Sequence, residues 1–143
     1  MIKNISNLGD AAVYCDFGVE VNKSVNSEVI KYFKALKKEN VESINNLTPS
    51  YNKLIVSYDL RKTNFKEVKK LIENLNVNET QDNNSTKIEI PVCCDDQFSL
   101  DIKRLEEKLN INRDKILENF FSKEYFCYMT GFIAGMPFLG DLD

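Results

Sequence analysis

The chain has 143 residues, of which 43% are hydrophobic and 29% charged, a composition typical of one globular domain or two small ones. Its net charge is -3, which excludes the strongly basic face that binding to nucleic acid requires. Histidine is absent, which excludes a Ser-His or Cys-His nucleophile pair and a His-ligated zinc site built from this chain.

The sequence also predicts a cytoplasmic protein without a membrane partner. No apolar run approaches the roughly 18 residues that span a bilayer, and the N-terminus lacks a hydrophobic signal core. The four cysteines fit a reducing compartment. Because nothing basic adjoins Cys93 and Cys94, we expect both to be small buried groups rather than reactive thiols.

The first 78 residues read as a hairpin, a helix, two strands and a second helix. Gly9-Asp10 predicts the turn between strands at 2–8 and 11–17. Asn22 or Ser24 is positioned to cap the following helix. The apolar stripe of that helix consists of Val25, Val29, Tyr32, Phe33 and Leu36.

Two more strands are predicted at 41–47 and 53–60, with a bend between them at Thr48-Pro49-Ser50. Asn64 and Glu67 form a capping-box pattern at the start of the second helix. Its predicted buried stripe consists of Phe65, Val68, Leu71, Ile72 and Leu75.

A polar linker at 79–86 separates this domain, residues 1–78, from a second segment at 87–143. The second segment reads as a strand at 87–93, helices that open at Ser99 and Asn112, and a strand at 125–132. The predicted fold class is therefore α+β, a mostly antiparallel sheet with helices on one face, followed by a β-α-α-β extension. That extension is expected to begin a second domain of which only part is present.

Three groups of residues invite a functional interpretation, each with a plainer structural alternative. Asp95, Asp96 and Asp101 could bind Mg²⁺, although acidic side chains also decorate loops and first helical turns. Gly131, Gly135 and Gly140 could expose backbone N–H groups to an anion, but without a Walker or GxGxxG pattern structural turns are the simpler interpretation.

Aromatic residues form the third group. The cluster Phe120, Phe121, Tyr125, Phe126 and Tyr128 could be a partner surface, or it could pack into a core. Tyr51 could present its hydroxyl at a loop tip, or it could cover a sheet edge.

Several segments resemble one family, the B component of bacterial ATP-dependent 5-oxoprolinase, also called allophanate hydrolase subunit 1. The matching pieces are Leu8-Gly9-Asp10-Ala11-Ala12, Thr48-Pro49-Ser50-Tyr51 with Leu54 to Asp59, Ile88-Glu89-Ile90-Pro91-Val92, and Tyr125 to Leu139. The last of these reads Gly-Phe-x-x-Gly-x-Pro-Phe-Leu, where the family typically has Gly-Phe-x-Pro-Gly-Phe-x-Tyr-Leu.

The departures from the family pattern matter too. Ala134, Met136 and Phe138 stand where the family has proline, phenylalanine and tyrosine, and Phe120 stands at a common histidine. The resemblance also implies a further cyclophilin-like β-domain with Pro-Arg, Pro-x-Gly-Ser and Gly-Gly-Trp motifs. These motifs do not occur in the 143 residues, which contain no tryptophan.

By resemblance, the complete complex hydrolyses ATP to open 5-oxoproline to glutamate, and this chain would be a non-catalytic part that docks to the C and A components of that complex. The chain itself is expected to bind no cofactor or metal, with ATP implied for the full complex. Its catalytic residues are unknown, and the candidate substrate-binding or family-loop residues are Gly131, Phe132, Gly135, Pro137, Phe138 and Tyr51.

Two other functions stay open at this point. The same family includes the Kip-type inhibitor of a sporulation histidine kinase, so the chain could be a regulatory binding module. It could also be a truncated protein without independent activity. If the second segment lacks a partner sheet, residues 126–142 are expected to be mobile, exchanged between chains or shielded by dimerisation, and a homodimer could form through residues 120–142.

Overall fold

The computed structural model describes residues 1–77 and 86–140. The chain forms two compact units, Met1–Asn83 with Phe126–Asp143, and Asn84–Tyr125. Residues 126–140, which include most of the last predicted strand, therefore belong to the first unit. The predicted linker at 79–86 lies outside the described residues, except for its last residue.

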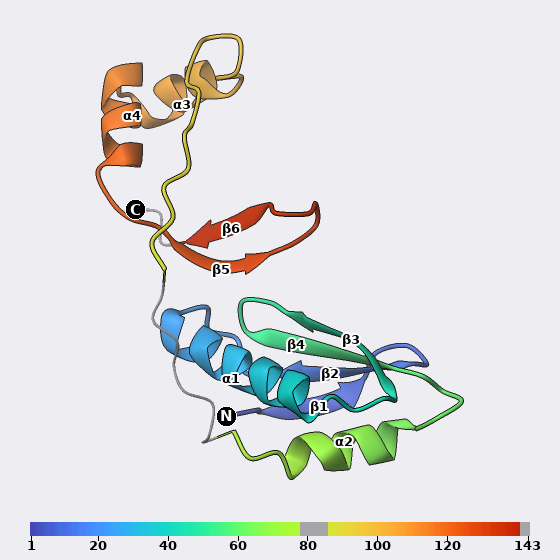
Figure 1. The fold of residues 1–143 in the computed structure, drawn as a ribbon. Coiled ribbons are helices and arrows are strands. Elements are labelled where there is room, and N and C mark those ends of the chain that lie inside the picture. The colour runs from blue at the N-terminus through green and yellow to red at the C-terminus, as the bar shows by residue number, and fades with distance from the viewer. Residues whose placement is uncertain (78–85, 141–143) are drawn as a thin grey trace. The chain divides into compact units, whose positions relative to one another are not determined.

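The first unit contains a four-stranded antiparallel sheet, two helices and a separate two-stranded hairpin (Figure 1). The strand order is β1-β2-β4-β3 in the sheet and β5-β6 in the hairpin. The elements are β1 (Asn4–Asn7), β2 (Ala12–Asp16), α1 (Lys23–Glu39), β3 (Ile44–Pro49), β4 (Lys53–Tyr58), α2 (Phe65–Glu73), β5 (Phe126–Thr130) and β6 (Pro137–Gly140).

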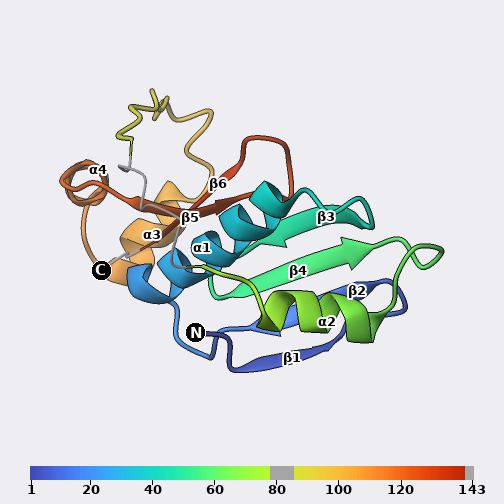
Figure 2. The same cartoon turned by 60° about the horizontal axis from the view of Figure 1, so that its bottom comes forward.

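The core lies between one face of the sheet and the two helices, as the alternation of apolar residues predicts. In β2 and β4, Val13 pairs with Val56 and Cys15 with Leu54, so all four side chains point to the same face and are fully buried. Figure 2 shows α1 and α2 on one face of the sheet. The predicted α+β class is confirmed. The helical side chains in the core are Val29, Leu36, Val68 and Ile72.

Asparagine side chains cap both helices of this unit. Asn22, rather than Ser24, caps α1, because its Oδ1 accepts from the backbone N–H of Val25 at 2.9 Å. At α2 the predicted cap is confirmed, since Asn64 Oδ1 accepts from the N–H of Glu67 at 3.2 Å. No helix in the described residues is long and apolar enough to cross a bilayer.

The third strand differs from the sequence prediction. β3 begins three residues later than expected and includes Thr48 and Pro49, with Pro49 opposite Leu54. Proline is tolerated there because β3 is an edge strand, where a missing N–H donor disrupts no ladder. The bend comes after it, where the N–H of Ser50 donates to the carbonyl of Lys53 at 2.8 Å.

The second unit contains α3 (Ile102–Leu109) and α4 (Arg113–Phe121), and none of its side chains in residues 86–125 is buried. Asn112 caps α4 as predicted, through the N–H of Lys115 at 2.9 Å, while α3 begins three residues after Ser99. The predicted strand at 87–93 is wrong, because residues 86–95 form neither strand nor helix. An alternating pattern forms a strand only where a neighbour completes the hydrogen bonds, and no described strand pairs with it.

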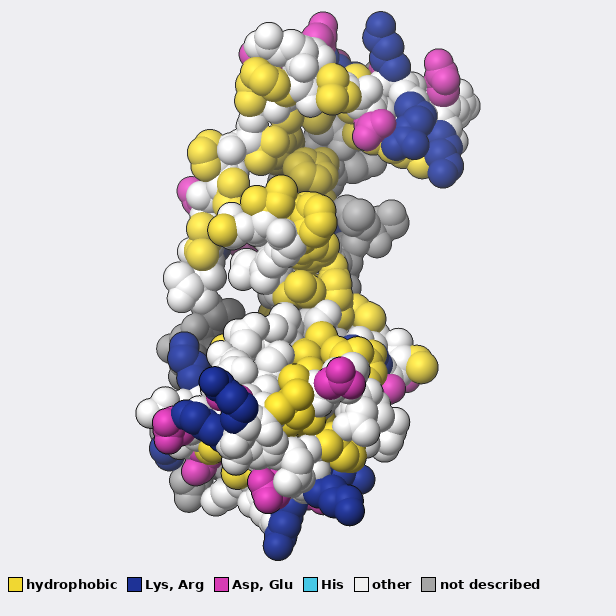
Figure 3. Space-filling model, turned by 90° about the vertical axis from the view of Figure 1, so that its right-hand side faces the viewer, with side chains coloured by type: hydrophobic (Ala, Val, Ile, Leu, Met, Phe, Trp, Pro, Cys, Tyr) yellow, Lys and Arg dark blue, Asp and Glu magenta, His cyan; other side chains and the backbone are white. Residues whose placement is uncertain are grey.

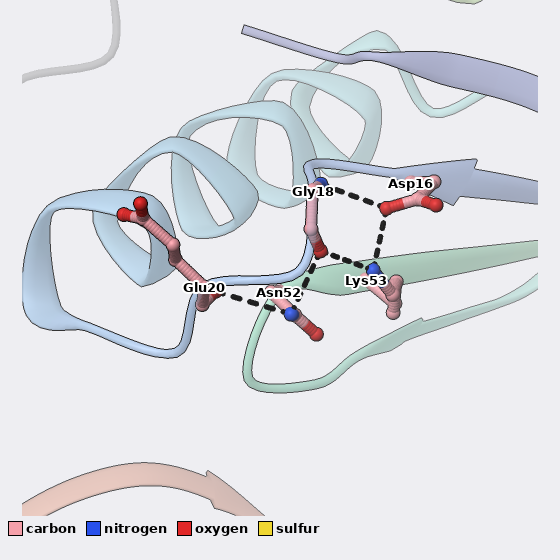
Figure 4. A network of polar contacts seen from close by, with 5 residues as sticks. All are labelled: Asp16, Gly18, Glu20, Asn52 and Lys53. Carbon is pink, nitrogen blue, oxygen red and sulfur yellow. Dashed lines mark hydrogen bonds and ion pairs between the residues drawn. The ribbon is translucent and has the colours of Figure 1, made fainter.

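A polar network fixes the loop between β2 and α1 (Figure 4). Asp16 Oδ1 accepts from Lys53 Nζ at 2.5 Å and from the N–H of Gly18 at 2.7 Å. Asn52 donates to the carbonyls of Gly18 and Glu20. Gly18 has a φ of 115°, which a residue with a Cβ rarely adopts. The network therefore holds the loop that leads into α1.

We predict that the ion pair between Asp16 and Lys53 stabilises the fold above about pH 3.9 and that this stabilisation decreases below that pH. The hydrogen bonds from Lys53 and Gly18 lower the pKa of Asp16. Because the folded pKa lies below the unfolded value of about 3.9, the contribution is complete above that pH and disappears as the pH falls through the folded pKa. A double-mutant cycle of Asp16→Asn and Lys53→Met, measured by urea unfolding at several pH values, should show a coupling free energy only above about pH 3.9. Coupling that is independent of pH would contradict this.

We also predict that the cysteines react selectively with a thiol reagent near pH 8. Burial raises the pKa of the Cys15 thiol to about 12, and its side chain is fully buried, so it should react only after unfolding. Cys93 and Cys127 are exposed and should be labelled in the folded protein. Cys94 is half-buried, so the expectation that Cys93 and Cys94 are both buried is wrong. Mass spectrometry of labelled peptides tests this, and equal labelling of Cys15 and Cys93 would contradict it.

Candidate functional site

The hairpin β5-β6 carries most of the site residues that the sequence predicts. Its strands pair from Phe126 opposite Gly140 to Thr130 opposite Pro137, and they enclose a loop at 131–136. The register shifts between Cys127 and Met129, which marks a β-bulge at Tyr128. Residues 126–140 contain no Asp, Glu, Lys or Arg, so the hairpin offers apolar side chains and backbone polar groups rather than charged ones.

Tyr128 is the buried centre of the hairpin. Its side chain is 3% exposed, and its ring lies 5.2 Å from the ring of Tyr51 and 4.8 Å from that of Phe126, between centroids. A Cβ added to Gly140 would lie 2.9 Å from Tyr128 Cδ2 and closer still to Cε2. Only glycine fits at this position, because the buried tyrosine ring occupies the space of a side chain.

Asn26, on α1, attaches the hairpin to the rest of the first unit. Its side chain is 2% exposed, and Nδ2 donates to the carbonyls of Ser50, Tyr51 and Tyr128 at 3.1, 3.0 and 3.1 Å. Because an amide has two protons, three acceptors mean that at least one proton is shared. One side chain thus joins a helix, the β3-β4 turn and a strand 102 residues away in sequence.

The structure brings some predicted site residues together and places others apart. Tyr51 lies against Phe138 with 6.3 Å between ring centroids, so it covers the hairpin strands, which was the structural alternative. Gly131, Phe132 and Gly135 form the loop, and Pro137 opens β6 opposite Thr130. Whether any of these six residues contacts a substrate stays a prediction.

The predicted aromatic cluster is divided between the two units. Phe126 and Tyr128 belong to the hairpin, while Phe120, Phe121 and Tyr125 lie in the second unit. There the rings of Phe120 and Tyr125 are 5.4 Å apart, and the two phenylalanines are 40% and 55% exposed. Core packing therefore explains the first group, whereas the second group keeps a large apolar surface in solvent.

Sequence reasoning did not identify Asn26, and it named Gly140 as a possible anion-binding or turn glycine rather than for its contact with Tyr128. For Asn26 a signal exists, because it falls on the helical stripe with Val29, Phe33 and Leu36, where a polar residue needs a buried partner. For the packing of Gly140 against Tyr128 the sequence contains no signal, since the ring that excludes a side chain there lies on the paired strand.

The carboxylates considered as Mg²⁺ ligands do not form a site. Asp96 pairs with the guanidinium of Arg113, and Asp101 pairs with that of Arg104 at 3.1 Å. Across residues 1–77 and 86–140, no three His, Cys, Asp or Glu residues are grouped as a metal site requires.

A surface cavity of about 480 Å³ lies beside α2, away from all six predicted residues. Its lining mixes charged, amide and leucine side chains, from Glu39, Glu67, Lys70, Leu71, Asn74, Leu75 and Asn76. The titratable groups that line it carry no described pairing that resembles a catalytic acid and base.

We predict that Asn26→Ala destabilises the protein by about 1–3 kcal/mol, since it removes the donor from three buried or half-buried carbonyls. Amide hydrogen exchange in β5 should rise along with the loss of unfolding free energy measured in urea. Asn46→Ala is the matched control, because that amide donates to Thr48 at the exposed edge, and the change should stay within about 0.5 kcal/mol. Equal effects of the two substitutions would contradict the role given to Asn26.

Comparison with known proteins agrees with this architecture. Residues 3–143 match the family model of the carboxyltransferase domain, subdomain C and D. Over 150 aligned residues the chain is 27% identical to the B component of the 5-oxoprolinase of Bacillus subtilis (strain 168), covering 96% of this chain and 62% of that protein.

A crystal structure of TTHA0988 superimposes with a TM-score of 0.76 at 23% identity, covering 92% of this chain and 26% of that one. At this identity the likeness concerns the fold alone. The chain thus spans less than two thirds of the B. subtilis relative and about a quarter of TTHA0988. With a family match over nearly all of its residues, the chain belongs to the carboxyltransferase domain, subdomain C and D family.

Proposed function

We propose that this chain serves as a non-catalytic docking part of the B component of a 5-oxoprolinase, binding the C and A components of an ATP-hydrolysing complex. The B. subtilis relative bears the name of that B component, which supports the choice of complex over the kinase-inhibitor alternative. The ATP and 5-oxoproline of the full reaction would be bound in the complex rather than by this chain alone.

The observation that carries the proposal is the second unit's apolar surface. No side chain in residues 86–125 is buried, and Ile88, Ile90 and Val92 are 75%, 58% and 53% exposed. Contiguous exposed apolar groups on a soluble protein mark surfaces that another polypeptide covers. Their alternation fits a strand that pairs once a neighbouring strand is supplied.

The helices of the same unit extend this surface. Neither α3 nor α4 buries an apolar side chain completely, since Ile102, Leu105, Ile116 and Leu117 are only half-buried. The connection between the two helices is fixed by the N–H of Arg113, which donates to Glu106 Oε1 at 2.7 Å. Phe98 and Leu100, before α3, are 62% and 88% exposed. The unit therefore has ordered elements but lacks a core, and a partner protein would provide one.

We predict that the chain co-elutes with the purified C and A components in size-exclusion chromatography. Ile88→Lys with Ile90→Lys should weaken this, because two charges would enter the apolar contact. Glu89→Lys is the matched control, since its exposed side chain lies between them on the opposite side of the alternating pattern.

Failure of the unchanged chain to co-elute would contradict the docking role. ATP hydrolysis by the A and C components should be measured in parallel, with and without 5-oxoproline. An increase in ATP hydrolysis that requires both 5-oxoproline and this chain would assign the chain a part in catalysis and so contradict the non-catalytic role.

A further inference from the structure

The loop at 131–136 contains a strained three-residue turn. The N–H of Ile133 donates to the carbonyl of Gly131 at 2.7 Å, which closes the turn around Phe132. Phe132 has a φ of 63°, in the left-handed region that bulky residues avoid. Non-glycine residues in this region persist where the surrounding structure holds them, and they concentrate at functional sites.

A second turn completes the loop and holds the first in place. The N–H of Met136 donates to the carbonyl of Ile133 at 3.0 Å, and Gly135 between them has a φ of 80°, as the third position of a type II turn requires. The N–H of Gly131 donates to the carbonyl of Met136 at 3.1 Å, which joins the two turns at the end of the hairpin.

These turns direct apolar side chains into solvent. Phe132 is 90% exposed, Ile133 62% and Met136 41%. Figure 3, in which the loop end of the hairpin faces the viewer, shows hydrophobic side chains gathered on this part of the first unit. An exposed aromatic ring and a strained backbone are both unfavourable, and packing among the described residues compensates for neither.

The support beneath the loop is rigid. Asn26 holds the carbonyl of Tyr128, and the ring of Tyr128 lies against Gly140 on the paired strand. The hydroxyl of Ser50 also contacts the sulfur of Met129 at 3.4 Å. The loop therefore extends from a buried base, and its backbone loses little conformational freedom when it binds.

We propose that Phe132 is the anchor of a protein-docking loop and inserts into an apolar pocket on the partner protein, with Ile133 at the rim. We infer that this pocket of the partner is uncharged and lined by aliphatic and aromatic side chains. Residues 126–140 contain no charged side chain with which an ionic group of the partner could pair. This inference rests on the proposed docking function and names a contact on the first unit, separate from the apolar surface of the second.

The test measures, by calorimetry, the Kd of the chain for the purified C and A components together. Phe132→Asn should raise the Kd at least about 30-fold, the effect typical of a buried aromatic anchor. Asparagine tolerates a positive φ, so this variant should keep or increase its stability in urea, which separates lost docking from lost folding. Phe132→Trp keeps a large ring and should bind within about tenfold of the original chain.

Val19→Ser is the matched control, because Val19 is 94% exposed on another loop of the same unit, and its Kd should change by less than about threefold. Binding of the original chain with an unchanged Kd for Phe132→Asn, or an equal loss in the Val19 variant, would overturn the role of Phe132 and leave the docking function standing. Absence of binding by the original chain would overturn both.

Discussion

The amide of Asn26 is the contact on which the attachment of the C-terminal hairpin to the first unit depends. A buried polar group is costly unless its hydrogen bonds are made, and this one is made only when α1, the β3-β4 turn and β5 meet. The C-terminal hairpin has two strands, too few to be stable alone in water. Its attachment to the helix and the turn therefore decides whether its loop is displayed in a fixed direction.

The two units differ in how far they bury their apolar side chains. The first buries Val13, Cys15, Leu54 and Val56 between sheet and helices and leaves few large apolar groups exposed outside its loops. The second has two capped or connected helices but no buried side chain among residues 86–125. Secondary structure without a core is stable only against another surface, since tertiary packing rather than propensity supplies most helical stability.

The sequence predicted most of the first unit because its signals are local. The alternation in β2 and β4, the caps Asn22 and Asn64, and the helical stripes all act within a few residues. The errors concern residues whose structure depends on residues that are far away in the sequence. Residues 87–93 alternate like a strand but have no described partner, and the hairpin joins the first unit through a contact across 102 residues. Gly140 is similar, because the ring that excludes a side chain belongs to another strand.

The family loop can lose its proline and still keep its turn. In the pattern that the chain resembles, proline precedes the glycine at Gly135 and presets the second position of a type II turn, whereas here Ala134 stands there. The positive φ of Gly135 is the stricter requirement, and it is retained. Alanine at the second position enlarges the unfolded ensemble, at a cost of about 0.4–1 kcal/mol, but it leaves the folded geometry allowed. The replacement of proline by alanine therefore reduces the preorganisation of the loop but does not change its folded shape. Phe132 is held outward by the hydrogen bonds at Gly131 and Met136 and by the buried base below them.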